Sequence, residues 1–170
     1  MQMRHTVIDS PLGELTLVAT ADALTGLYFR HHWHGPTADA LGRYVEPAAD
    51  ALFVHAADQL SEYLTGGRTQ FDLPVALIGE PHHRRVWELL VDIAYGETVT
   101  YGELAAKLGD GTTAYEVGQA VGRNPLSIIV PCHRVVGKDG ALTGYAGGLK
   151  RKRFLLDLEE PVPAAAGRLF

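Results

Sequence analysis

Two short helices joined by a glycine-rich turn are predicted for residues 100–122, and this pattern limits the folds that the chain can adopt. Each helix begins with the Thr-x-x-Glu pattern of a capping box, in which both side chains accept hydrogen bonds from backbone N–H groups of the first turn. The two boxes are Thr100 with Glu103, and Thr113 with Glu116. The Gly-Asp-Gly sequence at residues 109–111 supplies the turn between the helices. The pattern predicts a helix-turn-helix, which is typical of DNA-binding proteins but also occurs in ordinary helical cores.

The first part of the chain predicts a small sheet with one helix. Residues 4–9 and 14–20 should form a hairpin, because apolar residues flank a turn that contains Ser, Pro and Gly. Residues 24–29 could add a third strand, and residues 48–64 have apolar side chains at helical spacing. Residues 31–47 mix His, Trp, Gly and Pro without a clear period, so no regular structure is expected there.

A second domain is expected after the Gly-Glu-Pro break at residues 79–81. Apolar residues then follow at spacings of three and four, which predicts an amphipathic helix around Val86 to Ile93. We therefore expect an α/β (α+β) chain with an N-terminal α/β domain at residues 1–78. A mostly helical C-terminal domain at residues 79–170 should contain the helix-turn-helix.

The net charge of −5 seems unfavourable for a nucleic-acid partner, but the acidity is confined to the first half. Residues 1–75 hold four Arg against nine Asp and Glu, whereas residues 76–170 hold eleven basic and eleven acidic residues. Lys150, Arg151, Lys152 and Arg153 form a basic run, and Arg123 and Arg134 flank the cysteine region. These six cations predict a local patch that faces phosphates, although such a run is also typical of a solvated helix face.

The location of the chain is predicted from its apolar segments. No apolar run approaches the roughly 20 residues of a membrane-spanning helix. The polar start of the chain lacks the layout of a signal peptide. A cytoplasmic protein without a membrane partner is therefore expected.

The chain has one cysteine, Cys132, which lies in the apolar sequence Ser-Ile-Ile-Val-Pro-Cys-His-Arg-Val-Val. A single thiol can form no internal disulfide and no sulfur-rich zinc site. Taken alone, it is a buried small hydrophobe or a reactive nucleophile next to His133. His31, His32 and His34 offer no clear i, i+4 pair and no obvious carboxylate, so no metal site is expected.

The Pro-Cys-His-Arg-Val sequence at residues 131–135 matches the signature of the O6-alkylguanine-DNA alkyltransferases, which the chain resembles. Further matches follow in family order: Val86-Trp87, Tyr95-Gly96-Glu97-Thr98, Tyr101-Gly102-Glu103-Leu104-Ala105, Val117-Gly118, Asn124-Pro125, Gly144-Tyr145-Ala146-Gly147-Gly148 and Leu155-Leu156-Asp157-Leu158-Glu159. The resemblance is strong from about residue 83 to 160 and weaker before. It implies a ribonuclease H-like N-terminal domain and a winged-helix-like C-terminal domain that holds the active site.

The resemblance implies that Cys132 accepts an alkyl group from the O6 atom of guanine in DNA, once and irreversibly. The thiolate is the nucleophile, so a base must take the thiol proton. In similar proteins the histidine next to the cysteine does this through a water and is oriented by a glutamate, which points to His133 and Glu159. Without the resemblance, Glu159 reads as a solvated carboxylate at a helix end. No cofactor is implied, because the alkylated cysteine is the product.

The resemblance also assigns substrate-binding residues. It places the Tyr101 hydroxyl at the edge of the base and main-chain carbonyls near the cysteine and Val135 at its exocyclic amine. Tyr145 would form part of the pocket wall, and Asn124 would brace the turn around the active site. Ala146 departs from those members that carry a serine there.

Similar proteins bind double-stranded DNA from the minor groove and flip the damaged nucleotide into the active site. The expected DNA-binding residues here are Thr113, Ala114, Tyr115, Gly118 and Arg123. The family usually has an arginine where this chain has Tyr115, whose ring can fill the vacated base stack but carries no charge. A monomer is expected, and whether it binds DNA cooperatively stays open.

Three other functions are compatible with parts of the pattern. An alkyltransferase-like protein would bind the lesion without repairing it, but such proteins have replaced the cysteine. A transcriptional regulator would use the same helix-turn-helix but would need a further domain. The unusual Tyr115 leaves open a small-molecule alkyl donor in place of DNA.

Overall fold

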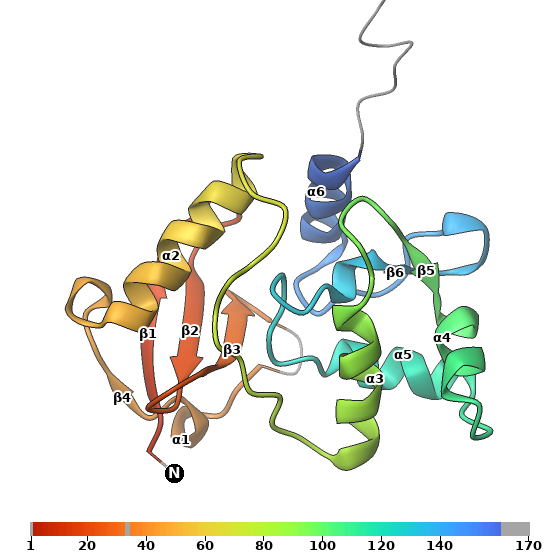
Figure 1. Ribbon diagram of the computed structural model, residues 1–170, viewed down its shortest axis with the longest axis horizontal. Coiled ribbons are helices and arrows are strands. Elements are labelled where there is room, and N and C mark those ends of the chain that lie inside the picture. The colour runs from red at the N-terminus through yellow and green to blue at the C-terminus, as the bar shows by residue number, and fades with distance from the viewer. Residues whose placement is uncertain (1, 33–34, 161–170) are drawn as a thin grey trace, which may run out of the picture.

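The computed structural model describes residues 2–32 and 35–160, which form a sheet domain and a helical domain side by side (Figure 1). The sheet domain contains β1 (Arg4–Ile8), β2 (Leu15–Ala19), β3 (Leu24–Phe29) and β4 (Arg43–Tyr44). The strand order is β3-β2-β1-β4, in which β2 is antiparallel to both β1 and β3, and β4 is parallel to β1. The predicted hairpin and third strand are confirmed.

Helix α2 (Ala51–Leu64) packs on the sheet and buries one of its faces. It begins at Asp50, whose carboxylate accepts hydrogen bonds from the backbone N–H groups of Leu52 and Phe53. A one-turn 3-10 helix at Pro47–Ala49 precedes it, so the α-helix starts three residues later than predicted. The buried face of α2 consists of Phe53, Ala56, Leu60, Tyr63 and Leu64.

The prediction of no regular structure in residues 31–47 is wrong for part of that segment. Residues Ala38–Leu41 form the short helix α1, capped by the Thr37 side chain, and Arg43–Tyr44 form β4. Gly42 joins them with φ of 69°, and a Cβ there would lie 2.0 Å from the Met3 carbonyl oxygen. Elements this short carry no period in the sequence and depend on pairing with β1. Trp33 and His34 lie outside the described residues.

The helical domain contains the predicted helix-turn-helix. Its elements are α3 (Pro81–Val91), β5 (Val99–Thr100), α4 (Tyr101–Leu108), α5 (Ala114–Gly122), β6 (Val135–Val136), α6 (Leu149–Glu159) and one-turn 3-10 helices at Cys132–Arg134 and Lys138–Gly140. Both capping boxes are formed. Helix α3 packs against α5, and Trp87 Nε1 donates a 2.7 Å hydrogen bond to the Ala120 carbonyl oxygen. The two boxes thus open the two helices of the motif.

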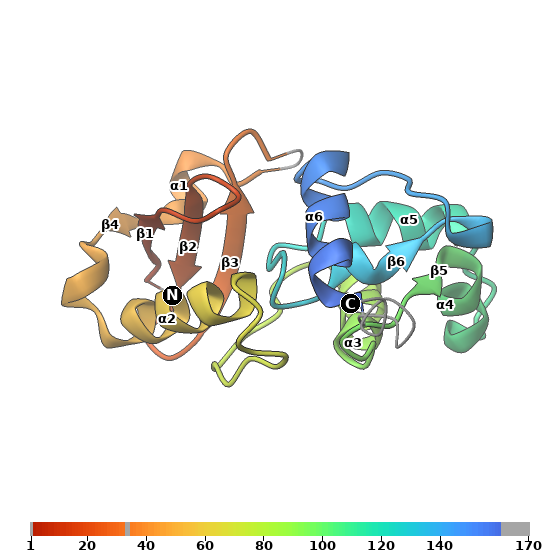
Figure 2. The ribbon, with the colours of Figure 1, turned by 90° about the horizontal axis from the view of Figure 1, so that it is seen from above.

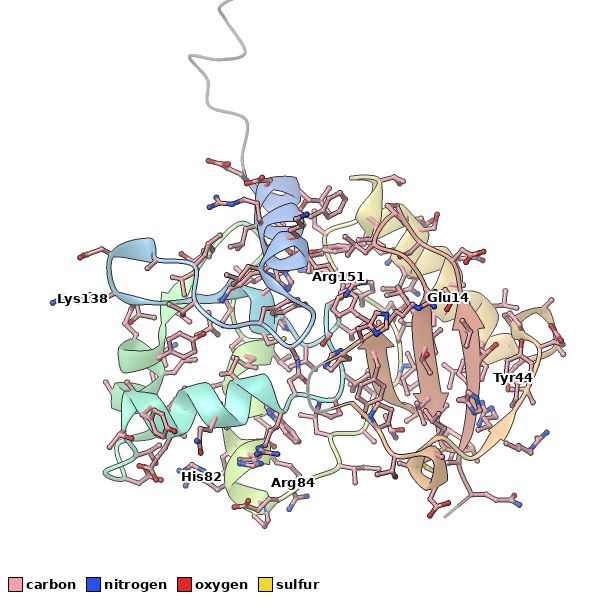
Figure 3. All side chains as sticks on the ribbon, turned by 180° about the vertical axis from the view of Figure 1, so that it is seen from behind. Glu14, Tyr44, His82, Arg84, Lys138 and Arg151 are labelled. Carbon is pink, nitrogen blue, oxygen red and sulfur yellow. The ribbon has the colours of Figure 1, made fainter. Side chains whose placement is uncertain are left out.

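The two domains share one buried core and meet where β3 faces the loop before the cysteine and the start of α6 (Figure 2). The Leu27 N–H of β3 donates a 2.7 Å hydrogen bond to the carbonyl oxygen of Pro125, the residue that begins the segment leading to the cysteine. Arg151 of α6 places its guanidinium 4.9 Å from the Phe29 ring centroid (Figure 3). Gly147 lies against the same ring, where a Cβ would come within 2.4 Å of Phe29. The sheet domain therefore supports the backbone around the cysteine.

Among the described residues, no helix has the length and apolar character to cross a membrane.

Candidate active site

The thiol of Cys132 stands at the start of a one-turn 3-10 helix, and the residue is 3% exposed. The segment before it is held by Asn124, whose Nδ2 donates to the Val130 carbonyl oxygen at 2.9 Å. The Asn124 Oδ1 accepts from the Leu126 N–H at 3.0 Å. Ile128 in this segment has φ of 73°, a conformation that costs a β-branched residue on the order of 1–3 kcal/mol. The surrounding structure thus fixes a strained turn directly before the cysteine.

Burial raises the pKa of the Cys132 thiol. The side chains of Asn124, Ser127 and Tyr145 and the charge of Lys152 favour the thiolate and partly offset this effect. The Ser127 and Tyr145 hydroxyls are buried without a conventional hydrogen-bond partner in the described part of the chain, and both face the thiol region. The thiol is therefore protonated at rest, and its reaction needs a base.

His133 is fully buried beside the cysteine, and its Nε2 lies 2.9 Å from Glu159 Oε2. A carboxylate only accepts hydrogen bonds, so Nε2 carries the proton and Nδ1 holds a free electron pair. Nδ1 is buried and has no hydrogen-bond partner among residues 2–32 and 35–160. Burial lowers the pKa of His133, and contact with Glu159 works in the opposite direction. The imidazole is thus neutral, is held in one tautomer, and has a free nitrogen that can accept a proton.

Glu159 is the best-bonded carboxylate of the site, because four groups donate to it. Arg134 donates from Nε and Nη2, each at 2.8 Å, while His133 Nε2 and the Tyr63 hydroxyl both donate to Oε2. The Gly96 N–H approaches Oε1 at 3.4 Å. Burial disfavours the carboxylate, but the bonds from His133 and Arg134 outweigh it and hold the pKa of Glu159 well below its usual range. Glu159 is 3% exposed, so the reading as a solvated carboxylate at a helix end is wrong.

The predicted phosphate-facing patch is not formed as a whole, because three of its six cations point into the protein. Arg134 binds Glu159 and the Ile93 carbonyl oxygen. Lys152 is fully buried and donates to the carbonyl oxygens of Thr143 and Gly144 at 2.7 and 3.2 Å.

Arg151 donates to the carbonyl oxygens of Leu12 and Arg30 in the sheet domain, and Figure 3 shows it at the junction between α6 and that domain. Helix α6 packs on the segment around Cys132 and on the sheet domain, so two of its four consecutive cations, Arg151 and Lys152, donate hydrogen bonds to backbone carbonyl oxygens. Lys150, Arg153 and Arg123 remain exposed.

A pocket next to this site is lined by Tyr101, Gly118, Val121, Gly122, Gly144, Tyr145 and Ala146. It borders a groove of about 520 Å³, with which it shares the lining residues Tyr101, Gly118, Gly122 and Gly144. Tyr101 is half-buried and its hydroxyl accepts a 3.4 Å hydrogen bond from Thr143 Oγ1. A Cβ at Gly118 would lie 3.7 Å from the Tyr101 ring, so α5 approaches the tyrosine closely. The structure thus brings Tyr101 and Tyr145 together around one pocket.

Three of the predicted DNA-binding residues, Tyr115, Gly118 and Arg123, line the same groove along α5, whereas Thr113 and Ala114 are not among its lining residues. Thr113 caps the helix, and Ala114 and Tyr115 follow in its first turn, with Tyr115 73% exposed. Gln119 Nε2 donates a 2.9 Å hydrogen bond to the Tyr115 hydroxyl. Arg123 is the C-cap residue of the helix and also lines the groove. Val135 lies apart from this surface, since it opens β6, is fully buried and pairs with Val99.

Sequence reasoning missed three residues that lie around the thiol and the His133–Glu159 pair: Tyr63, Ser127 and Lys152. Tyr63 occupies an apolar position on α2, 96 positions from Glu159 in the sequence. Lys152 lies in a run of cations that the sequence suggests are exposed, and nothing local distinguishes it from its neighbours.

No metal site was expected at His31, His32 and His34, and His34 lies outside the described residues. His32 Nδ1 lies 3.1 Å from the Phe29 N–H, and the described residues contain no cluster of metal-binding side chains.

Comparisons with known proteins agree with this arrangement. The family model for the ribonuclease-like domain of 6-O-methylguanine DNA methyltransferase matches residues 3–77, and the model for its DNA binding domain matches residues 81–161. The chain is 44% identical over 168 residues to a methylated-DNA–protein-cysteine methyltransferase of Mycobacterium tuberculosis, which covers 99% of both chains. A constitutive methyltransferase of the same name from Bacillus subtilis is 39% identical, over 91% of this chain and 94% of the relative.

Among solved structures, M. tuberculosis OGT in complex with DNA matches with a TM-score of 0.82 and 42% identity, over 92% of each chain. Two family models together span nearly all of the chain, and the relatives match it from end to end. The chain belongs to the 6-O-methylguanine DNA methyltransferase family.

Proposed function

We propose that this protein repairs DNA by transferring an alkyl group from the O6 atom of guanine to Sγ of Cys132, and that each molecule acts once. One observation supports this proposal above the others. A buried thiol lies next to a histidine whose Nδ1 is free and whose Nε2 is bonded to a buried carboxylate, on a helix-turn-helix domain. This is the arrangement of a nucleophile, a base and an orienting group.

The proposed reaction begins with the loss of the thiol proton. That proton passes through a water to Nδ1 of His133, and Glu159 stabilises the imidazolium that forms. The thiolate then attacks the alkyl carbon, so that a bond from Sγ to carbon forms as the bond from carbon to O6 breaks. The electron pair stays on guanine, which takes up a proton from the Tyr101 hydroxyl. The imidazolium finally gives up its proton to solvent, from which the tyrosine regains one.

The product explains the single turnover. A thioether is chemically stable, and the sequence has no second cysteine whose thiol could take over the alkyl group. The protein would therefore be consumed stoichiometrically and would require no cofactor.

DNA reaches this site through base flipping in the proposed mechanism, because a buried thiol cannot touch O6 inside a duplex. The groove beside α5 borders the pocket, and Gly118 and Gly122 leave room along it for a close approach of the backbone. Tyr115 is the side chain that would enter the vacated stack, since it is exposed at the start of α5. The proposed partner is double-stranded DNA, which a monomer of the protein binds. We place the boundary between the two domains at residues 78 and 79.

The test counts alkyl groups transferred per protein molecule from a duplex that carries one O6-methylguanine. The proposal predicts one transfer per molecule, even with DNA in large excess, and none for Cys132→Ser. The serine variant should still bind the lesion duplex, because the pocket and the helix-turn-helix are unchanged. Repeated turnover, or demethylation by Cys132→Ser, would show that the nucleophile is misassigned.

A further inference from the structure

We infer that Tyr63, which comes from the sheet domain, is a positioning residue of the proton relay in the helical domain. Its hydroxyl holds the Glu159 carboxylate and the Nε2 side of His133 in the geometry that leaves Nδ1 free for the thiol proton. This inference rests on the proposed alkyl transfer, and it assigns the N-terminal domain a direct part in that chemistry.

Tyr63 reaches the site from the last turn of α2 and is fully buried. Its ring packs between Phe71 and Tyr95, with ring centroids 5.1 and 6.1 Å away. The side chain of Tyr63 therefore has little conformational freedom, and its hydroxyl occupies one defined position. There it donates to Oε2 of Glu159, the same oxygen that accepts from His133.

The hydrogen bonds around Oε2 define the role of the phenol. The Tyr63 hydroxyl donates to Oε2, and its own oxygen lies 3.4 Å from His133 Nε2. Nε2 thus faces two oxygen atoms, both of which can accept its proton. Burial and the nearby Glu159 charge raise the pKa of Tyr63, so the phenol stays a donor throughout the ordinary pH range. This arrangement favours the tautomer with the proton on Nε2.

Tyr63 also moderates the charge that His133 experiences. Glu159 and a thiolate at Cys132 are the negative groups at this site, and Arg134 and Lys152 are the positive ones. Tyr95 faces Tyr63 and lies near Arg134, but its own hydroxyl donates to the Leu158 carbonyl oxygen instead. Removing the Tyr63 donor would leave more negative charge on Oε2. An imidazolium would then be stabilised, and His133 would become protonated at a higher pH.

The experiment compares Tyr63→Phe with Tyr95→Phe, a matched control that removes a neighbouring hydroxyl not bonded to Glu159. Rates of transfer from free O6-benzylguanine, which needs no base flipping, are measured across pH in single-turnover reactions. Tyr63→Phe should lower the plateau rate about tenfold, because Glu159 and His133 lose the hydrogen bond that holds them in the reactive orientation, and a lost hydrogen bond to a charged group has about this size. The fall of the transfer rate on the acid side of the pH profile should also move to higher pH in Tyr63→Phe. The rate and pH profile of Tyr95→Phe should differ little from those of the parent.

A double-mutant cycle with Glu159→Gln separates positioning from a purely structural effect. If Tyr63 acts through Glu159, Tyr63→Phe should cause almost no further slowing in the Glu159→Gln background. Two outcomes would overturn the inference: an unchanged rate and pH profile in Tyr63→Phe, or the same slowing in both backgrounds. If the parent protein itself transferred no alkyl group, the proposed function would fail instead, independently of Tyr63.

Discussion

His133 and Glu159 are 26 positions apart in the sequence, yet Nε2 of the histidine lies 2.9 Å from Oε2 of the glutamate. Their contact joins the 3-10 helix that carries the cysteine to the last turn of α6. Both side chains are buried, so the position of α6 fixes the orientation of the imidazole. This pair leaves Nδ1 as the free nitrogen of the imidazole, and the proposed mechanism uses that nitrogen as the base for the thiol proton.

Replacing Glu159 by Gln should slow alkyl transfer by about a hundredfold or more, in the range of lost general-base assistance. The amide cannot stabilise the imidazolium, although it keeps the shape of the side chain. Single-turnover rates at saturating lesion DNA measure the effect, and DNA affinity should change little. Glu160→Gln is the matched control, because Glu160 is exposed next to Glu159. A parental rate in Glu159→Gln would remove Glu159 from the mechanism.

The same carboxylate should make the fold sensitive to acid. The pKa of Glu159 is lower in the folded protein than its ordinary value of 4.5, so the folded state favours the ionised form. Its contribution to the free energy of unfolding is full above that value and is lost as pH falls below it. Urea unfolding at several pH values should therefore show a shallower acid decline for Glu159→Gln than for the parent. If the free energy of unfolding declined equally steeply with acid in both proteins, ionisation of Glu159 would make no contribution to the stability of the fold.

Lys152 should tune the cysteine from behind the active-site loop. Burial lowers the pKa of Lys152 to about 8, and its positive charge favours the Cys132 thiolate. Lys152→Met should therefore raise the pKa of the thiol and slow its reaction with iodoacetamide, whereas Lys150→Met, at an exposed position, should not. In the parent, the rise of thiol reactivity with pH should flatten above about pH 8, as the ammonium loses its proton. An unchanged thiol pKa in Lys152→Met would contradict this role.

Tyr115 tests how the flipped base is replaced. If its ring fills the gap, an effect of about 1–3 kcal/mol is expected from base–aromatic stacking. Tyr115→Ala should then slow repair of duplex DNA but affect free O6-benzylguanine much less, because the free base needs no flipping. Gln119→Ala, which removes the hydrogen bond to the Tyr115 hydroxyl, should have a weaker effect of the same kind. Tyr115→Arg should restore or raise the duplex rate. Equal slowing on both substrates would exclude a role as a wedge.

Local patterns were sufficient to predict the first three strands and the helix-turn-helix, but not every element of the fold. The capping boxes at Thr100 and Thr113 and the glycine at 109 define the helix-turn-helix through interactions within a few residues, and all of these formed. The β4 strand could not be predicted, because two residues carry no period and their pairing with β1 is a tertiary contact.

The site was predictable only where a motif names its residues. The family signature pointed to Cys132 and His133, which are adjacent, and to Glu159 through the order of the motifs. Tyr63 and Lys152 could not be found this way, since their roles depend on how α2 and α6 pack. The basic run at residues 150–153 was misjudged for the same reason. Counting charges cannot show that Lys152 is buried among backbone carbonyls.

Alkyl transfer to Cys132 is tested most directly by the intact mass of the protein after incubation with a duplex that carries one O6-methylguanine. The mass should increase by one methylene group, located on Cys132 by peptide mapping, and unmodified guanine should appear in the DNA. An unchanged mass in the presence of bound lesion DNA, or a methyl group on any residue other than Cys132, would contradict it.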